Sequence, residues 1–447
     1  MQTISEHGAI DLIALKAAHP ERYPCLLQSL ARGAAPARYD LLFATHGEYL
    51  ELAADGLRGS PGVPTDGSFL QALSDWQASQ HASRPIDPSL PFRGGWVVHL
   101  AYELAAQIEP ALGRLPAHAS DWPIALALRC PVALLFDHQT GALHLIAEAH
   151  AESLASQVRA DVAALAAGQL QESGLPETIW QLDEQDPRRY LDGVGRIQAY
   201  LAAGDTFQIN LSRRWRAIST GPVDPHALYR RLARSNPAPF AGLLSWRGMH
   251  LLSSSPERLL EVRGDRVQTR PIAGTRPRRH DDDNFLSLPR DPKERAEHVM
   301  LIDLERNDLG RICVPGSIEV NELLGVETYA HVHHIVSNVR GRLRPGLTVG
   351  EIISACFPGG TITGCPKLRS MQIIAELEGE GRGPYTGALG YLDVSGDLDL
   401  NILIRSMLLQ AQSLEFRAGA GIVVDSIPER ELEETRAKAE GLLRAVR

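Results

Sequence analysis

The chain has 447 residues, of which 44% are hydrophobic and 22% charged, and its net charge of −9 offers no basic face for nucleic acid. This length predicts two domains or one large two-lobed domain, and the five scattered cysteines, with no CxxC pair, exclude a disulfide framework or a zinc site. With no signal-like N-terminus and no apolar stretch of about 20 residues, we expect a soluble, cytoplasmic protein that binds no membrane.

The first part of the chain predicts strands and one long helix. Apolar runs that predict buried or half-buried strands occur at 38–44, 94–103 and 130–137. An alanine-rich stretch at 149–170 has apolar residues three and four positions apart, which predicts a helix. The polar, turn-rich segment 171–187 is interpreted as a linker. We therefore expect an N-terminal region over 1–170, on the partner or regulatory side, and a catalytic domain over 187–447.

The second part alternates clusters of strands with helices. Helical spacing occurs at 187–205, ending near Gly204, and at 291–312, 348–360 and 426–446. Strand patterns occur at 206–217, over 242–271 with glycine turns, and at 383–394, 398–410 and 414–424. Strand clusters followed by helices indicate an α+β protein built on antiparallel sheet.

Two carboxylate pairs are the first candidates for chemistry. Glu294 and Glu297 lie three residues apart, so a helix places both on one face, where they can hold a divalent ion or form an ordinary solvated surface. Glu433 and Glu434 begin another helical pattern, and Lys438 lies four residues beyond Glu434, a spacing that an ordinary helical salt bridge explains without any function. Neither pair is specific by itself.

Three further segments are rich in glycine, arginine or histidine. The backbone amides of FPGGTITGCPK, residues 357–367, can cradle a carboxylate or phosphate, although the residue order of a Walker loop is absent. QTRPIAGTRPRR, residues 268–279, places four arginines around the unreactive Ala273. His331, His333 and His334 lack a third ligand at familiar spacing, so metal binding by them is disfavoured.

In chain order, these motifs resemble the chorismate-utilising enzymes. The matching stretches are GDTFQINLSRR, SPERL, QTRPIAGTRPR, KERAEHVMLIDLERNDLGR, HHIVS, GGTITGCPK, YTGALGY, IRSM, AGAGIVVDS and EETRAKA. The family includes component I of anthranilate synthase and of aminodeoxychorismate synthase, isochorismate synthases and salicylate synthases. The resemblance is strong over 187–447 and weaker before it, where 38–44 and 91–110 look most like aminodeoxychorismate synthase component I. It implies an anthranilate synthase component I-like fold, with large antiparallel sheets in a sandwich flanked by helices.

The resemblance also implies a site for chorismate and Mg²⁺. Glu297 and Glu434 match the ligands of a Mg²⁺ ion that binds the ring carboxylate, and Glu294 lies beside them. Because hydroxide is a poor leaving group, the C4 hydroxyl needs a general acid, and Glu257 matches the family's proposed acid. Gln208 and His334 complete the catalytic set that the resemblance implies. The residues it assigns to substrate binding are Thr275, Thr361, Tyr385, Arg405, Gly421 and Lys438.

Two positions indicate how the ring is attacked. Family members that add water carry a lysine where this chain has Gln208, and an amide cannot act as that base, so ammonia is the expected nucleophile. Many aminodeoxychorismate synthases carry a nucleophilic lysine where this chain has Ala273, so a covalent lysyl intermediate is excluded here. No cysteine lies in a nucleophile elbow. Ammonia must therefore come from solution or from a separate glutamine amidotransferase subunit, component II.

The residues that bear on the product favour two different reactions. Ala273 is typical of anthranilate synthases, whereas Thr363 and the segment 236–244 favour aminodeoxychorismate synthase. CLLQSL, residues 25–30, only partly resembles the LLES element of the tryptophan feedback site. We favour Mg²⁺-dependent amination to 4-amino-4-deoxychorismate, for 4-aminobenzoate and folate synthesis. The alternatives are formation of anthranilate and pyruvate, and a non-catalytic chorismate-binding protein.

Overall fold

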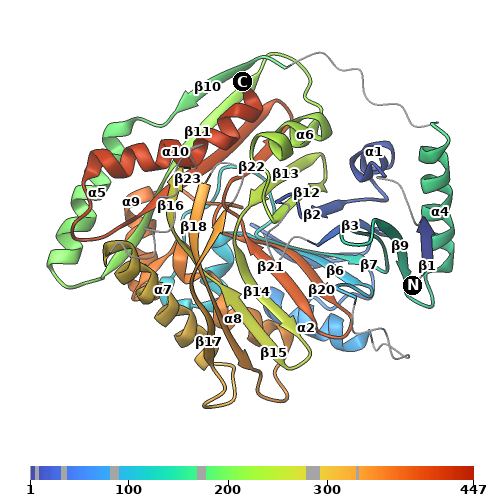
Figure 1. The fold of residues 1–447 in the computed structure, drawn as a ribbon, viewed down its shortest axis with the longest axis horizontal. Helices are drawn as coiled ribbons and strands as arrows, with labels where there is room; N and C mark the ends of the chain where they lie inside the picture. The colour runs from blue at the N-terminus through green and yellow to red at the C-terminus, as the bar shows by residue number, and fades with distance from the viewer. Residues whose placement is uncertain are drawn as a thin grey trace.

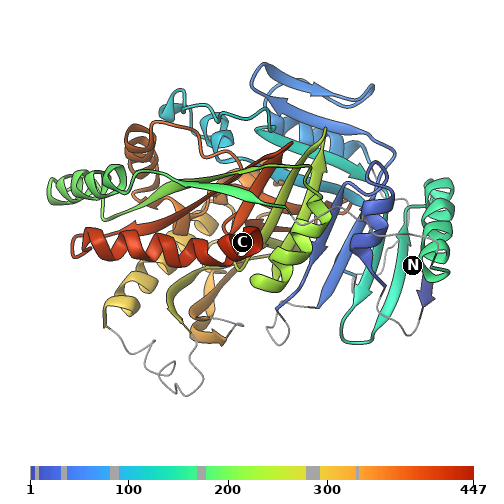
Figure 2. The same cartoon turned by 90° about the horizontal axis from the view of Figure 1, so that it is seen from above.

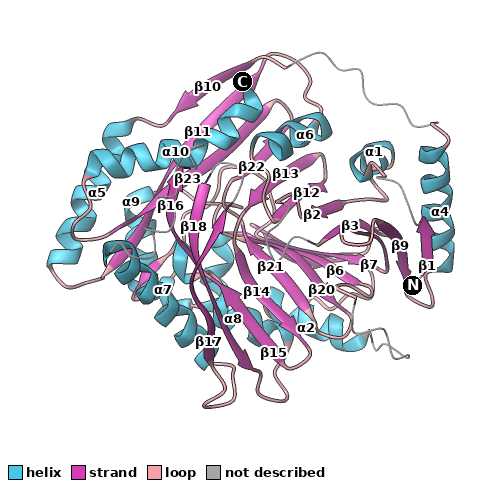
Figure 3. Cartoon of the chain, in the orientation of Figure 1, coloured by secondary structure: helices cyan, strands magenta, loops and turns pink. Residues whose placement is uncertain are grey.

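The computed structural model describes residues 2–5, 10–31, 38–80, 90–168, 178–277, 292–328 and 332–447. Two large antiparallel sheets form its centre, and helices cover them on the outside (Figures 1 and 3). A layer of buried side chains from both sheets, including Phe43, Val97 and Leu251, lies between them. The α+β class predicted from sequence is confirmed. No helix in the described part of the chain is long and apolar enough to span a membrane.

Each sheet contains strands from both halves of the chain. The first has the order β1 (Gln2–Ser5), β9 (Ala142–Ala147), β8 (Val132–Asp137), β3 (Tyr39–Ala44), β2 (Cys25–Gln28), β12 (Phe240–Trp246), β13 (Met249–Ser255), β22 (Ser406–Gln410), β23 (Ser413–Ile422), β11 (Gln208–Ser219), β10 (Trp180–Glu184), with β19 (Gly364–Cys365) beside β11. The second has the order β16 (Ile272–Pro277), β18 (Val332–Arg342), β15 (Arg266–Arg270), β14 (Arg258–Arg263), β21 (Leu398–Ile402), β20 (Ala388–Asp393), β6 (Gly95–Leu100), β7 (Ala125–Cys130), β4 (Tyr49–Ala53), β5 (Gly56–Gly59), with β17 (Glu319–Thr328) beside β18. The division into regions 1–170 and 187–447 stays a prediction.

The helices lie around these sheets. They are α1 (Leu12–Ala18), α2 (Phe69–Ser79), α3 (Ala105–Ile108), α4 (Glu152–Ala166), α5 (Pro187–Ala202), α6 (Pro225–Ser235), α7 (Pro292–Gly310), α8 (Val349–Cys356), α9 (Lys367–Glu378) and α10 (Pro428–Val446). Figure 2 shows α10 and α6 side by side, and α10 also packs on β23. The five predicted helices are confirmed as α4, α5, α7, α8 and α10.

The segment interpreted as a linker contains a strand. Trp180–Glu184 forms β10, which pairs with β11 from Trp180 opposite Ser219 to Glu184 opposite Trp215. The edge of β11 supplies hydrogen-bonding partners for the backbone of this segment. Pairing with β11 therefore makes the segment a strand although its composition is polar. The linker interpretation is therefore wrong for these residues, and 169–177 lie outside the described residues.

The predicted strand 398–410 is two strands in different sheets. β21 belongs to the second sheet and β22 to the first, and between them Arg405 has a φ of 54°. This left-handed conformation turns the chain sharply and is unusual for a residue with a side chain. Both strands are buried, so the apolar pattern continues through the turn. The change of sheet therefore could not be predicted from the sequence.

The chain crosses between the sheets a second time beside this point. β13 ends at Ser255 in the first sheet and β14 begins at Arg258 in the second, so Glu257 lies in the connection. The two crossings are hydrogen-bonded: the Ile402 amide donates to the Glu257 carbonyl at 3.0 Å, and the Ser254 amide donates to the Arg405 carbonyl at 3.0 Å. The fold therefore fixes Glu257 and Arg405 next to each other, where the sheets meet.

Candidate active site

A cavity of about 490 Å³ lies at this meeting point, between β11, β16, α7 and α10. Its volume suits a small organic ligand. Side chains from distant parts of the sequence line it, and several were expected at the site. Those expected residues are Gln208, Ala273, Glu294, Glu297, Thr361, Arg405, Gly421, Glu434 and Lys438.

Two helices bring carboxylates to the cavity. α7 contributes Glu294 and Glu297, three residues apart, and α10 contributes Glu431 and Glu434 at the same spacing. Gln208 donates through Nε2 to Oε1 of Glu297 at 3.1 Å. A Cβ at residue 421 would lie 2.3 Å from that Nε2, so any other residue there would displace the amide of Gln208 from its present position.

The carboxylates suit a hard divalent cation that also binds a substrate oxygen. No three or more His, Cys, Asp or Glu side chains within the described ranges are arranged to hold a metal by themselves. Mg²⁺ commonly uses only one or two protein carboxylates, together with water and substrate oxygens. The cavity wall supplies such carboxylates from two helices. Their negative charge would repel an anionic substrate unless a cation offset it. The donor set therefore fits Mg²⁺.

Glu257 lies behind the cavity wall, in contact with residues that line it. The Ile272 amide donates to its Oε1 at 3.4 Å. The Thr361 hydroxyl lies close to the same carboxyl group, yet it is buried without a partner at hydrogen-bond geometry. Burial raises the pKa of Glu257 to about 8, and the nearby carboxyl of Glu305 adds to this rise. Glu257 is therefore protonated at neutral pH, as a general acid must be.

Two cations face these acids. Lys438 pairs with Glu434 at 2.7 Å and donates to the Gly419 carbonyl at 3.0 Å. Burial opposes the charge of Lys438, but Glu434 outweighs it and raises the pKa of the ammonium. Burial lowers the pKa of Arg405, against the opposite effect of Tyr385 and Glu257. An arginine with so high an ordinary pKa still carries its charge at neutral pH and can bind a carboxylate.

His334 and Tyr385 are buried behind these cations and do not line the cavity. Burial lowers the pKa of His334 to about 3, and the charges of Arg405 and Lys438 act in the same direction. The imidazole is therefore neutral. The hydroxyl of Tyr385 lies 2.9 Å from where a Cβ of Gly419 would be, beside the carbonyl that Lys438 binds.

The strand that carries Ala273 has an irregular register against β18. The register shifts between Ala273, opposite Ile335, and Thr275, opposite His334. Gly274 takes the intervening left-handed conformation with a φ of 57°, and a Cβ there would lie 2.8 Å from Oε2 of Glu294. Glycine therefore allows the strand to approach the carboxylate. The side chain of Thr275 lies outside the described residues.

Thr363, which favours aminodeoxychorismate synthase in the sequence comparison of motifs, lies outside the cavity lining. Its hydroxyl is buried and donates to the Gly359 carbonyl at 2.9 Å, and it does not line the cavity, whereas Thr361 does. The tight turn at 359–363 points alternate threonines in different directions, which the sequence could not reveal. Any influence of Thr363 on the product would therefore have to act through the conformation of this turn and not through contact with the cavity.

The sequence reasoning missed several lining residues, and Asn210 and Glu431 are the two whose spacing could have revealed them. Asn210 lies two residues after Gln208 on β11, so strand alternation places both side chains on one face. Glu431 precedes Glu434 by one helical turn, the same spacing that drew attention to Glu294 and Glu297. The Oε1 atom of Gln208 and the Oδ1 atom of Asn210 are buried without hydrogen-bond partners among the described residues. These acceptors mark a polar wall that suits a ligand with N–H or O–H groups.

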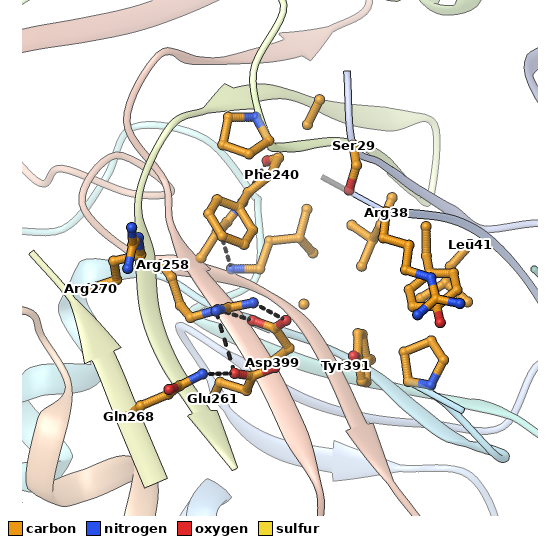
Figure 4. A pocket seen from close by; sticks show the side chains of 18 of the residues that line it. Ser29, Arg38, Leu41, Phe240, Arg258, Glu261, Gln268, Arg270, Tyr391 and Asp399 are labelled. Atoms are coloured by element: carbon orange, nitrogen blue, oxygen red, sulfur yellow. Dashed lines mark hydrogen bonds and ion pairs between the residues drawn. The ribbon is translucent and has the colours of Figure 1, made fainter. Parts of the chain in front are cut away.

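A second cavity, of about 480 Å³, lies between the sheets away from the candidate site (Figure 4). Gln28 and Ser29, from the stretch that partly resembles a tryptophan feedback element, line it. Asp40 already binds this stretch, because it accepts from Nε2 of Gln28 at 2.8 Å and from the Ser29 amide at 2.9 Å.

The arginine-rich segment contributes to this second cavity. Figure 4 shows Arg258 facing Asp399 and Glu261, and Arg270 at the cavity's edge. Arg270 lines this cavity and pairs with Glu322 and Glu327, each at 2.6 Å. Arg270, one of the four arginines around Ala273, therefore faces this second cavity and the acidic side chains of β17 instead of the candidate site. Arg278 and Arg279 lie outside the described residues, as does the side chain of Arg276.

Comparison with known proteins identifies one enzyme family. The profile of the family described as chorismate binding enzyme matches residues 34–444. An anthranilate synthase component I-like protein of Synechocystis sp. is 40% identical over 390 residues, covering 85% of this chain and 78% of that protein. Aminodeoxychorismate synthase component 1 of Bacillus subtilis is 39% identical over 372 residues, covering 79% and 77%. The crystal structure of anthranilate synthase component I from Streptococcus pneumoniae has a TM-score of 0.81 at 33% identity and covers 93% of both chains.

The structural similarity confirms the anthranilate synthase component I-like fold that the sequence predicted. The family match extends over nearly the whole chain, including the residues that line the cavity. This chain belongs to the family of chorismate-binding enzymes.

Proposed function

We propose that the chain is the chorismate-aminating component of a two-subunit enzyme and forms 4-amino-4-deoxychorismate. The observation that carries this proposal is the carboxyl of Glu257, buried directly behind a cavity whose polar wall holds Gln208 in place of a base for water. A proton donor allows the C4 hydroxyl to depart. Because residue 208 is not a lysine, the cavity lacks a base that could activate water, which favours ammonia as the nucleophile.

The charges of the cavity support binding of a dianionic substrate. Arg405 and Lys438 provide cationic groups for the carboxylates of chorismate. Glu297 and Glu434 would hold Mg²⁺, which when bound supplies a positive charge to the ring carboxylate. The side chains of this chain carry out the proton transfer and hold the ammonia.

The reaction balances with one proton passing through Glu257. As the C4–O bond breaks, Glu257 donates its proton and the hydroxyl leaves as water. The nitrogen of ammonia forms a bond to C4 of the ring and loses one proton, and this proton returns to Glu257. The sum is chorismate plus ammonia giving 4-amino-4-deoxychorismate plus water. The substrate must bring its C4 hydroxyl past Thr361 to within hydrogen-bond reach of Glu257.

Gln208 is suited to holding ammonia. Its Nε2 is engaged by Glu297, which leaves Oε1 as an acceptor without a partner in the described structure. An N–H group satisfies such an acceptor, and burial makes an unsatisfied one costly by about 1–3 kcal/mol. We therefore infer that Oε1 of Gln208 accepts a hydrogen bond from the incoming ammonia.

Anthranilate formation is the second candidate. Ala273, which offers no lysine to the ring, and relatives named anthranilate synthase component 1, such as that of Thermus thermophilus at 42% identity over 369 residues, favour it. Both reactions need the same acid, cations and Mg²⁺ site. They differ in whether the enolpyruvyl group is kept, so product identity must decide.

The isolated chain is expected to aminate chorismate with ammonium but not with glutamine. No cysteine lies in a nucleophile elbow, so the chain has no means of releasing ammonia from glutamine. Chorismate loss with Mg²⁺ and either nitrogen source would be followed by chromatography, with and without an added glutamine amidotransferase subunit. Glutamine-dependent turnover by the pure chain would contradict the proposal of a separate ammonia source.

The product is expected to yield 4-aminobenzoate only when aminodeoxychorismate lyase is added. Without the lyase, little pyruvate and no anthranilate fluorescence should appear. Mass spectrometry of the protein during turnover should find no covalent ring adduct, because residue 273 is alanine. Stoichiometric pyruvate and anthranilate in the absence of lyase would instead establish the second candidate.

A further inference from the structure

Glu305 is a second buried carboxyl near the candidate site that the proposed reaction does not use. It lies on α7, is 4% exposed, and does not line the cavity. Thr269 donates through its hydroxyl to Oε2 of Glu305 at 2.8 Å, and the Gly360 backbone forms a further hydrogen bond with the carboxyl. A Cβ at Gly360 would lie 3.4 Å from Oε1, so the turn packs closely on Glu305.

Both partners of Glu305 belong to segments that contact Glu257. Thr269 lies near the end of β15, and the chain continues to Ile272, whose amide donates to Glu257. Gly360 immediately precedes Thr361, whose hydroxyl lies close to the Glu257 carboxyl. Glu305 therefore links, from behind, the two segments that form the walls around Glu257.

The charge of Glu305 also acts on Glu257. Burial is the larger cause of the raised pKa of Glu257, and Glu305 adds to it, whereas Lys438 opposes it. Burial and then Asp308 raise the pKa of Glu305 to about 7, although Lys367, paired with Asp308 at 2.6 Å, opposes this rise. Glu305 is therefore mainly charged above pH 7, in the range where Glu257 loses its proton. The titratable and charged groups that face the pair are Asp308, Lys367 and Cys356 on the side of Glu305, and Lys438 and Arg405 on the cavity side.

We propose that Glu305 is a positioning residue that braces the two segments around Glu257 and, through its negative charge behind them, keeps Glu257 a proton donor. This inference rests on the proposed function, because a donor is required only if the C4 hydroxyl leaves. Glu305 reaches neither the cavity nor its substrate. Its effect passes through Thr269, Gly360 and the electrostatic field at Glu257.

The test compares wild type with Glu305→Gln, which keeps an acceptor oxygen for Thr269 and Gly360 but removes the charge. Asp303→Asn is the matched control, because Asp303 lies on the same helix, is exposed and pairs only at the surface with Arg306 at 2.8 Å. The pH dependence of kcat and KM is measured at constant free ammonia. We expect the alkaline fall of kcat in Glu305→Gln to move down by about one pH unit. KM for chorismate should stay within about twofold of wild type, and the control should match wild type.

An infrared measurement without substrate separates this inference from the proposed function. The band of the protonated carboxyl of Glu257, assigned by its loss in Glu257→Gln, is titrated with pH, and its midpoint should fall in Glu305→Gln. An unmoved midpoint, or a loss of kcat that is equal at every pH, would overturn the positioning role. If the midpoint moves but wild type does not aminate chorismate, the coupling stands and the proposed function fails.

Discussion

Substitution of Glu257 by glutamine is expected to lower kcat for chorismate amination at least about 100-fold, the usual scale for loss of a general acid. The amide has nearly the shape of the carboxyl group but cannot give its proton to the departing hydroxyl. In wild type, kcat should fall as the pH rises through about 8, where Glu257 loses its proton. This fall should be absent from the residual activity of the variant. Both are measured by steady-state kinetics with ammonium.

Thermal unfolding distinguishes this loss from damage to the fold. The folded-state pKa of Glu257 is raised above its unfolded value of 4.5, so folding binds a proton and the cost to stability grows between pH 4.5 and about 8. Glutamine carries no such cost, so Glu257→Gln should be at least as stable as wild type at pH 8. A wild-type rate and pH profile in this variant would show that Glu257 has a structural role alone.

Removal of either proposed metal ligand is expected to abolish measurable turnover. Glu297→Ala and Glu434→Ala each delete a carboxylate that would hold Mg²⁺ near the substrate, while both helices stay packed. Substitution at Glu434 also leaves Lys438 without its ion-pair partner. Kinetics over a range of Mg²⁺ concentrations should show no recovery at ordinary levels. Calorimetric titration with Mg²⁺ in the presence of chorismate should show weakened binding.

Glu433→Ala provides the matched control for the metal prediction. Glu433 is the neighbour of Glu434 on α10, but its side chain is exposed and pairs with Arg436 at 2.7 Å. This surface pair should contribute little, so the control should keep wild-type activity and Mg²⁺ dependence. Wild-type turnover in Glu297→Ala or Glu434→Ala at ordinary Mg²⁺ would remove the metal assignment.

Local spacing predicted those parts of the site that lie on single helices or strands. Glu294 and Glu297 reach the cavity together because they are one helical turn apart, and Glu434 pairs with Lys438 for the same reason. The helices themselves followed from their apolar periodicity and end signals, such as Gly204, which follows the last turn of α5 with a φ of 80°.

Positions that depend on the arrangement of the sheets could not be predicted in this way. Glu257 and Arg405 are neighbours because two crossings between the sheets are hydrogen-bonded to each other, and nothing in the alternation of apolar residues marks a crossing. Arg270 binds acidic partners on β17 for the same kind of reason. Trp180 lies in a strand because β11 offers an edge, although the surrounding composition is that of a linker.

The most direct test of the account is the position of the new nitrogen in the product. The purified chain is incubated with chorismate, Mg²⁺ and ¹⁵N-labelled ammonium, and the product is examined by NMR before any lyase is added. If the chain forms 4-amino-4-deoxychorismate, the product carries one ¹⁵N atom on C4 of a non-aromatic ring that keeps its enolpyruvyl group. An aromatic product with ¹⁵N beside the carboxylate-bearing carbon, together with free pyruvate, would contradict the account.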